Sequence, residues 1–293
     1  MTNHDSTGLF TFSQRANFWN ELYEHPSSLF EHNMVLRRDY AKQYICTHFD
    51  KSTSILDLGC GAGVLSEKLL ESSFTVTAVD ASQDMLDLSR ERLKRFPAES
   101  CKLFHANCLS LPFDDGKFDL VVCLGVFGYF DEVTQALREI HRVLRPGGKL
   151  IISVRNAHTA DIFDLFRLLK LPFRLMRVLA RRLSMRLQQS GLSHNESSAA
   201  QIKVGIPIDD GFRIQIYQVP SHLIEGVTQR GYALTEFDGL GYGPLEFAER
   251  KLLSTHFSVQ LSDFLNRFFR ASGLNRFSRW FADVSFFVFR RED

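Results

Sequence analysis

The sequence predicts an α/β protein built on an open, mostly parallel sheet with helices on both faces. Residues 55–63, Ile-Leu-Asp-Leu-Gly-Cys-Gly-Ala-Gly, carry a short apolar run into a turn with three alternating glycines. A helix-compatible run at 64–70 follows at once, and further short apolar runs lie at 74–80, 118–124 and 150–154. Buried parallel strands that alternate with helices produce this pattern.

The glycine turn at 59–63 is the most informative segment. It is nearly free of side chains, so a ligand can press against its backbone, and Asp57 precedes it at the strand end where such sheets bind ligands. A dinucleotide site would need a glycine where this chain has Val64, and a phosphate-binding loop would need a following Lys. The spacing therefore differs from both of those sites.

Later segments add residues in the expected order. The run at 74–80 ends in Asp80, and an acid at the tip of the second strand can accept both hydroxyls of a ribose. A loop at 105–113 precedes the fourth strand, which runs into an open loop. Asp131 is placed to cap a helix over 133–144, and Arg-Pro-Gly-Gly-Lys ends that helix before the fifth strand.

These motifs together resemble the class I S-adenosylmethionine-dependent methyltransferases. The resemblance rests on D-x-G-x-G-x-G at 57–63, on Asp80, on the loop at 105–113 and on L-R-P-G-G-K-L at 144–150, within about residues 50–156. It is closest to the small-molecule branch that includes ubiquinone and menaquinone methyltransferases. It implies a Rossmann-like, doubly wound, seven-stranded methyltransferase sheet with helical insertions, whose seventh strand lies antiparallel between the fifth and sixth.

The resemblance implies S-adenosylmethionine as the cofactor. Its expected binding residues are Asp57, Gly59, Cys60, Gly61, Gly63, Asp80, Ala81, Asn107, Cys108 and Leu124. Asn107 replaces the family's usual Asp, and its amide oxygen can accept from the adenine amino group while the Cys108 N–H donates to the ring. Arg37 and Arg38 are candidates to pair with the methionine carboxylate of the cofactor.

Methyl transfer is an in-line displacement that needs alignment and exclusion of water more than reactive side chains. His158 is the candidate general base, with a solvated surface role as the alternative, and Tyr129 can orient a substrate or simply pack. The expected substrate contacts are Phe127, Arg155, Asn156 and Tyr242. No Cys or His spacing suggests a metal site.

Four regions are expected. Residues 1–48 form an N-terminal helical cap, 49–156 the cofactor-binding core, and 157–220 a lid or substrate insertion. Residues 221–293 complete the core, with a helical insertion at about 239–283.

Both insertions leave alternatives open. Residues 167–186 read as a basic amphipathic helix, either a lid or a peripheral contact with an anionic membrane. The segment at 239–283 is rich in aromatic residues, which suit either a tunnel for a lipid-like substrate or a helical pair on the edge of the sheet.

Composition sets the remaining bounds. The chain has 293 residues, a formal net charge of +1 and five cysteines. The near-neutral charge argues against a nucleic-acid partner, and the odd cysteine number indicates free thiols in a reducing compartment.

No apolar leader is visible near the start, so a cytoplasmic location is expected, with contact at the inner face of a membrane as an option. The oligomeric state is not indicated.

The predicted function is methyl transfer from S-adenosylmethionine to a small or lipid-like acceptor, with O-methylation favoured. The family's DNA and RNA amino-methylases carry an Asn/Asp-Pro-Pro-aromatic loop after the fourth strand, whereas residues 124–129 read Leu-Gly-Val-Phe-Gly-Tyr. The alternative is a non-catalytic protein of the same fold that binds the cofactor or a partner.

Overall fold

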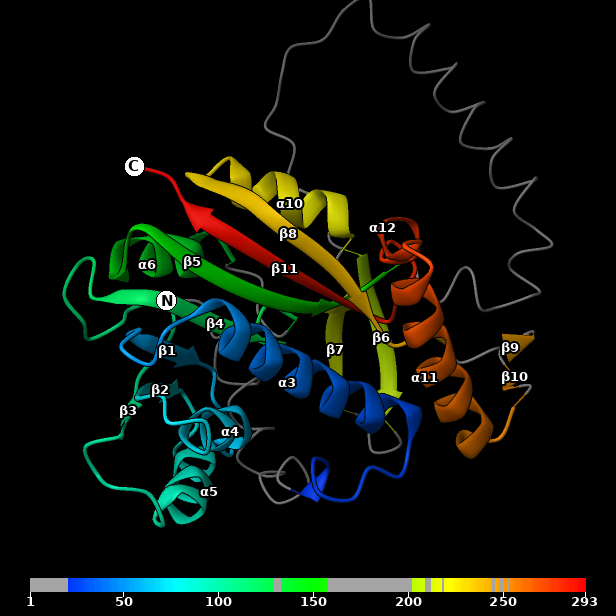
Figure 1. Cartoon of the computed structure of the whole chain (residues 1–293), viewed down its shortest axis with the longest axis horizontal. Helices are drawn as coiled ribbons and strands as arrows, with labels where there is room; N and C mark the ends of the chain where they lie inside the picture. The colour runs from blue at the N-terminus through cyan, green and yellow to red at the C-terminus, as the bar shows by residue number, and fades with distance from the viewer. Residues whose placement is uncertain are drawn as a thin grey trace, which may run out of the picture.

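A seven-stranded sheet with helices on both faces forms the centre of the computed structural model (Figure 1). The structure describes residues 21–128, 133–157, 202–208, 212–217, 219–243, 246–247, 250–251 and 253–293. The strands of the sheet are β1 (Ile55–Leu58), β2 (Val76–Asp80), β3 (Cys101–His105), β4 (Phe118–Leu124), β5 (Leu144–Arg155), β8 (Tyr232–Leu240) and β11 (Val284–Arg291). The helices are α3 (Leu29–His48), α4 (Val64–Leu70), α5 (Gln83–Leu93), α6 (Val133–Val143), α10 (Pro220–Thr228), α11 (Thr255–Ala271) and α12 (Asn275–Ser278).

The strand order is β3-β2-β1-β4-β5-β11-β8. β1 pairs in parallel with both β2 and β4, and β4 pairs in parallel with β5. β11 pairs antiparallel with β5 on one side and with β8 on the other. The predicted α/β sheet and its inserted antiparallel seventh strand are therefore confirmed. The order reverses between β1 and β4, and the carboxyl ends of strands at such a reversal form a crevice suited to ligands.

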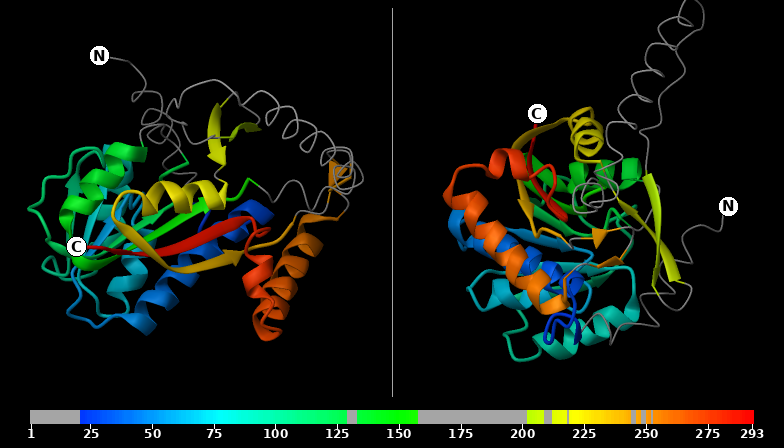
Figure 2. Two further views of the ribbon diagram at one scale, coloured as in Figure 1. Left: turned by 90° about the horizontal axis from the view of Figure 1, so that it is seen from above. Right: turned by 90° about the vertical axis from the view of Figure 1, so that its right-hand side faces the viewer.

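Each face of the sheet has its own core. Helices α3, α4 and α5 cover one face, and α6 and α10 cover the other (Figure 2). Strand β11 contributes side chains to both cores, because successive residues of a strand point to opposite faces of the sheet. Phe286 and Val288 join the core under α3 and α4, while Phe287 and Phe289 join the core under α6 and α10.

Helix α3 begins after an N-cap residue, Ser28. The Ser28 hydroxyl accepts from the Glu31 N–H at 3.2 Å, and the Glu31 carboxylate in turn accepts from the Ser27 hydroxyl at 2.9 Å. On its inner side α3 is tied to β8 by two tyrosines. The Tyr40 hydroxyl donates to Asp238 at 2.7 Å, and the Tyr44 hydroxyl donates to Glu236 at 2.5 Å.

Some elements depart from the sequence-based expectation. β5 begins at Leu144, so the Arg-Pro-Gly-Gly-Lys segment belongs to the strand and pairs irregularly with β4 near Phe118. A hairpin of β6 (Ile202–Ile208) and β7 (Phe212–Tyr217) lies in the region expected to be a lid, and β7 contacts β5. A short pair, β9 (Glu246–Phe247) and β10 (Arg250–Lys251), precedes α11.

None of the helices within the described ranges is both long enough and apolar enough to cross a membrane. The basic segment at 167–186 lies outside the described residues, as do His158 and Tyr129.

Candidate cofactor site and active site

The glycine turn joins β1 to α4 at the point where the strand order reverses. Gly59, Gly61 and Gly63 all have positive φ angles, of 72°, 54° and 75°. A Cβ at Gly59 would lie 2.3 Å from the Val126 side chain, and one at Gly63 would lie 2.4 Å from the Ser89 hydroxyl. A Cβ at Gly61 would meet no atom within 4 Å. Two glycines are thus required by internal packing, whereas Gly61 faces open space that a ligand can enter.

Asp80 connects the turn to the end of β2. Its Oδ2 accepts the Gly61 N–H at 2.8 Å, and its Oδ1 accepts the Ser82 N–H at 2.9 Å. Burial raises the pKa of this carboxyl, and the backbone N–H donors oppose that rise by stabilising the ionised form. The same side chain fixes the peptide of Gly61 and the first turn of α5, so its position is closely defined.

Asp57 lies deeper, within β1, and is almost completely buried. Its Oδ2 accepts the hydroxyl of the buried Ser66 on α4 at 2.7 Å. Burial raises the pKa of Asp57 to about 6, and the charge of Asp80 adds to the rise. This carboxyl therefore ties α4 to β1 beneath the turn. Cys60 of the turn is buried as well, and burial raises the pKa of its thiol.

The loop after β3 is shaped by the Asn107 side chain. The Asn107 Oδ1, assigned from the sequence to the adenine amino group, accepts the Leu109 N–H at 2.9 Å. Asn side chains commonly bond their own backbone two residues on, and this bond shapes the loop. The His105 ring, at the end of β3, bonds the Ala81 carbonyl at 3.0 Å and so joins this loop to the segment after β2. Cys108 is half-buried.

The loop after β4 lies against both the glycine turn and α3. Gly125, directly after Leu124, has a φ of 77°, and a Cβ there would lie 2.3 Å from the Arg37 Nη1. Arg37 is buried, and its Nη2 donates to the Tyr23 hydroxyl at 3.0 Å. A cation from the N-terminal region thus lies at the ligand-binding edge of the sheet. Arg38 instead pairs with Asp39 at 2.7 Å.

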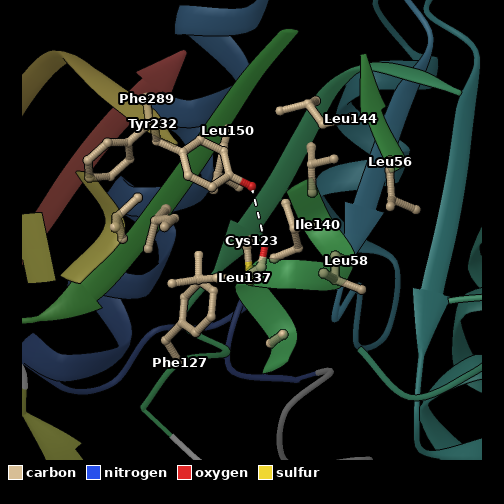
Figure 3. Packing of buried hydrophobic residues seen from close by; sticks show 14 of the residues in the cluster. Leu56, Leu58, Cys123, Phe127, Leu137, Ile140, Leu144, Leu150, Tyr232 and Phe289 are labelled. Carbon is tan, nitrogen blue, oxygen red and sulfur yellow. Dashed lines mark hydrogen bonds between the residues drawn. The ribbon is translucent and has the colours of Figure 1, made fainter. Parts of the chain in front are cut away.

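Phe127, which the sequence analysis assigned to the substrate, packs in the interior. The side chain is fully buried in the core under α6 and α10 (Figure 3). The same view shows Tyr232 in that core, where its hydroxyl donates to the Leu137 carbonyl at 3.4 Å. The loop after β4 folds back onto the sheet, so this aromatic ring packs inward.

Asn156 and Tyr242, also expected at the substrate, have structural contacts instead. Asn156 is fully buried, and its amide donates to the Trp280 carbonyl at 2.9 Å. The Tyr242 hydroxyl donates to Ser278 at 2.8 Å while its N–H donates to Ser262 at 2.9 Å. Tyr242 thus joins the end of β8 to α11 and α12, and Asn156 joins the end of β5 to the segment after α12.

Arg155 belongs to a buried cluster that the sequence did not reveal. Its Nη2 donates to the Asp283 Oδ1 at 2.9 Å, and Asn33 on α3 donates to the other carboxylate oxygen at 2.9 Å. The Arg155 and Asp283 side chains are only 14% and 4% exposed. The guanidinium also lies over the Phe30 ring, 5.1 Å from its centroid. Arg155 thus helps to join α3, β5 and β11 at the edge that carries the glycine turn.

Within the described ranges, no three His, Cys, Asp or Glu side chains gather closely enough to hold a metal ion.

Comparisons with known proteins agree with the geometry. Residues 56–152 match the family model described as "Methyltransferase domain". A demethylmenaquinone methyltransferase of Listeria welshimeri is 37% identical over 103 residues, which are 34% of this chain and 44% of that protein. Its counterpart in Shouchella clausii is 33% identical over 131 residues, which are 43% of this chain and 54% of that protein. The chain thus spans about half the length of the curated relatives it matches.

Solved structures show the same fold. An S-adenosylmethionine-dependent methyltransferase of Thermotoga maritima superposes with a TM-score of 0.53 and 13% identity, covering 98% of this chain and 100% of that one. A Pyrococcus horikoshii protein superposes with a TM-score of 0.54 and 18% identity, covering 87% and 90%. With the family match, these results identify residues 56–152 as a methyltransferase domain, in a chain that has the fold of S-adenosylmethionine-dependent methyltransferases. Within that class, this domain is similar to the demethylmenaquinone methyltransferases.

Proposed function

We propose that the chain transfers a methyl group from S-adenosylmethionine to a small, lipid-like acceptor, and that an acceptor oxygen is the favoured nucleophile. The observation that carries the proposal is the open space at Gly61 beside the Asp80 carboxylate. The similarity to demethylmenaquinone methyltransferases favours an acceptor with an apolar, quinone-like or comparable lipid body.

The cofactor would supply a methyl group on a positively charged sulfur, already activated toward a nucleophile. The residues of the turn fit such a ligand, because Gly61 leaves its peptide accessible at a φ of 54°. Gly59, Cys60, Gly63, Ala81, Cys108 and Leu124 are proposed to complete the cofactor site. Asp57 is proposed to act by holding α4 and the turn in position through Ser66.

Asp80 is the proposed acceptor for the ribose hydroxyls. An ionised carboxylate offers about four acceptor positions, and backbone N–H groups of Gly61, Ser82 and Ala81 bond to it. About one position therefore remains free, and a ribose hydroxyl can share the others. Because the pKa of this group is raised, its protonation as pH falls would remove the charge from these bonds and weaken cofactor binding.

Arg37 is the proposed partner of the cofactor's carboxylate. Its guanidinium lies against Gly125 after β4, and the Tyr23 hydroxyl orients one of its nitrogens. A buried cation at a ligand-binding edge favours an anionic group there. Asn107 is proposed to support the adenine end through the loop that its side chain shapes and through the second acceptor position of its amide oxygen, the first being taken by the Leu109 N–H.

The acceptor would need orientation and removal of one proton. His158 is proposed as the general base and Tyr129 as the orienting group, and both lie outside the described residues. Arg155 is proposed to shape the acceptor side of the site from its place in the Asp283 cluster.

The test is product formation from a methyl-labelled donor incubated with the protein and a cell extract. We expect label in a product that partitions into organic solvent. Asp80→Ala should weaken cofactor binding, measured by calorimetry, by roughly tenfold to a hundredfold, since a hydrogen bond to a charged group is worth about 1.5–3 kcal/mol. Asp87→Ala, which removes an exposed acid on α5, is the matched control.

The contrasting function is a non-catalytic protein of the same fold. It predicts cofactor binding that Asp80→Ala weakens, with no labelled product in either the organic or the aqueous fraction. Labelled product in the aqueous fraction alone would retain the methyltransferase proposal and replace the lipid-like acceptor by a soluble metabolite.

A further inference from the structure

Helix α11 (Thr255–Ala271) exposes its aromatic side chains and buries its small polar ones. Phe257, Phe264 and Phe268 are 61%, 57% and 46% exposed. Their spacing of seven and then four residues places them along one face of the helix. Ser258 and Ser262 are buried on the side toward the protein. This is the reverse of a helix whose apolar face completes a core.

Large apolar side chains are also exposed on α12 and in the turn before it. Leu274 is 49% exposed and Phe277 is 68% exposed. The α11–α12 aromatic surface is defined by Phe257, Phe264, Phe268, Leu274 and Phe277. These are all of the large apolar side chains found exposed in the described part of the chain. Exposed apolar residues that are scattered singly are ordinary, whereas these five fall within 21 residues of sequence on two helices that contact each other, which favours an interaction site.

The charges around this surface are mostly positive. Between 255 and 281 the chain has the arginines Arg267, Arg270, Arg276 and Arg279 and a single acid, Asp263. Asp263 pairs with His32 on α3 at 2.9 Å. Arg279 donates to the Phe237 carbonyl and is turned toward the protein, whereas Arg270 lies over the Tyr40 ring with its side chain still 42% exposed. Arg267 and Arg276 are exposed and give the surface a cationic border.

The surface also lies at the same edge of the sheet as the glycine turn. β8 runs parallel to β5, because β11 is antiparallel to both. The chain leaves the carboxyl end of β8 at Gly241, whose N–H donates to Asn266 on α11 at 3.1 Å. Figure 1 shows α11 standing across this end of β8 and beside α3.

We propose that the α11–α12 aromatic surface docks onto an anionic phospholipid bilayer. Helices of this type lie in the plane of a membrane, with aromatic residues in the acyl boundary and basic residues at the anionic headgroups. The exposed side chains of Arg267 and Arg276 give this surface a positive charge that an anionic bilayer complements. Docking would bring the ligand-binding edge to the layer in which a lipid acceptor resides.

The experiment is sedimentation with vesicles of phosphatidylcholine, with and without phosphatidylglycerol, and with no methyl donor or acceptor. It therefore tests docking separately from the proposed reaction. We expect the full chain to bind anionic vesicles and to be released as salt rises. Phe264→Gln with Phe268→Gln should reduce vesicle affinity about tenfold or more. Arg267→Gln with Arg276→Gln should remove the preference for anionic lipid.

The matched control is Arg90→Gln with Lys94→Gln on α5, which removes the same number of positive charges from two exposed side chains outside the α11–α12 aromatic surface. All three variants should keep the parent's cofactor affinity, which shows that they are folded. Failure of the parent to sediment, or equal sedimentation of the phenylalanine variant and the parent, would overturn the proposal. A parent dimer in light scattering that the phenylalanine variant dissociates would assign the surface to a second copy instead.

Discussion

Asp57 and Asp80, in adjacent strands below the glycine turn, differ in what they contact. Asp57 faces the buried Ser66 hydroxyl, while Asp80 contacts two backbone N–H groups at the ligand-binding edge. Burial raises the pKa of both carboxyls. One acid therefore supports the turn from within, and the other keeps acceptor positions at the site.

At residue scale, Gly61 and Gly147 allow a matched test of the cofactor site. Both have positive φ angles, 54° and 73°, and a Cβ at either would meet no atom within 4 Å. Gly61→Val and Gly147→Val should therefore both destabilise the fold, by about 1–2 kcal/mol for a left-handed conformation. Only the Gly61 variant should lose S-adenosylmethionine binding by calorimetry. Equal affinity in the two variants would place the cofactor elsewhere.

Asp57 should make stability depend on pH. Its pKa is about 6 in the folded protein and near 4 when unfolded. The folded state then binds the extra proton between these values, so the free energy of unfolding falls as pH rises from about 4 to about 6, by at most about 3 kcal/mol.

Asp57→Asn should remove this pH dependence of the free energy of unfolding, because the amide does not titrate. Its oxygen can still accept from Ser66, so the hydrogen bond is kept. Urea unfolding at several pH values measures the free energy of unfolding of both proteins. Parent and variant curves that stay parallel across this range would contradict the assignment.

At the scale of elements, Asp283 joins three elements that are distant in sequence. Its carboxylate accepts from Arg155 at the end of β5 and from Asn33 on α3. Its backbone N–H donates to the Gly241 carbonyl after β8 at 2.8 Å. This cluster holds α3 and the inserted strand in register beside the site. It also explains why Arg155, at the end of a central strand, is turned toward the protein interior.

A double-mutant cycle tests this cluster. Asp283→Leu breaks the pair with Arg155 and removes the acceptor of Asn33, and should reduce the free energy of unfolding by about 3–5 kcal/mol. Adding Arg155→Leu should restore part of the loss, because both buried charges are then removed. Asp87→Ala, which breaks the exposed pair with Arg90, should change stability by less than about 1 kcal/mol. Simple additivity of the two Leu substitutions would show that the ion pair is not coupled.

Local signals explain which parts of the site were predictable. Gly61 and Asp80 stand where a strand ends and a turn begins, and such positions are visible in a short stretch of sequence. Partners of Asp283 lie 128 and 250 residues away, and no local pattern indicates that pairing. The inward direction of Phe127 and Tyr242 depends on how their loops fold back, which residue type alone does not determine.

The fold, too, was predictable only in part from local sequence patterns. Alternating apolar runs and helices indicate an α/β sheet, but they do not give the strand order. The position of β11 between β5 and β8 came from the resemblance and is confirmed by the pairing. The β6–β7 hairpin was not predicted, because its strands lie in an insertion whose clearest sequence pattern is the basic helical one at 167–186.

At the scale of the whole molecule, β11 connects the two parts of the sheet and supplies both cores. Its removal, by ending the chain after Ala282, should abolish cooperative urea unfolding followed by circular dichroism. Phe286 and Val288 would be lost from one core and Phe287 and Phe289 from the other. Removing only Glu292 and Asp293 should leave the transition close to that of the full chain. A shortened protein without β11 that unfolds with the parent's cooperativity would contradict this role.

The same strand sets an order of events during synthesis on the ribosome. β1 to β5, which carry the glycine turn, are made before β8, and β11 is the last described element to emerge. Until it does, β5 and β8 both present unpaired edges, because the strand that separates them does not yet exist. Exposed strand edges pair readily with other chains. The nascent protein therefore passes through a stage in which its ligand-binding half can be formed while it is at its most vulnerable to aggregation.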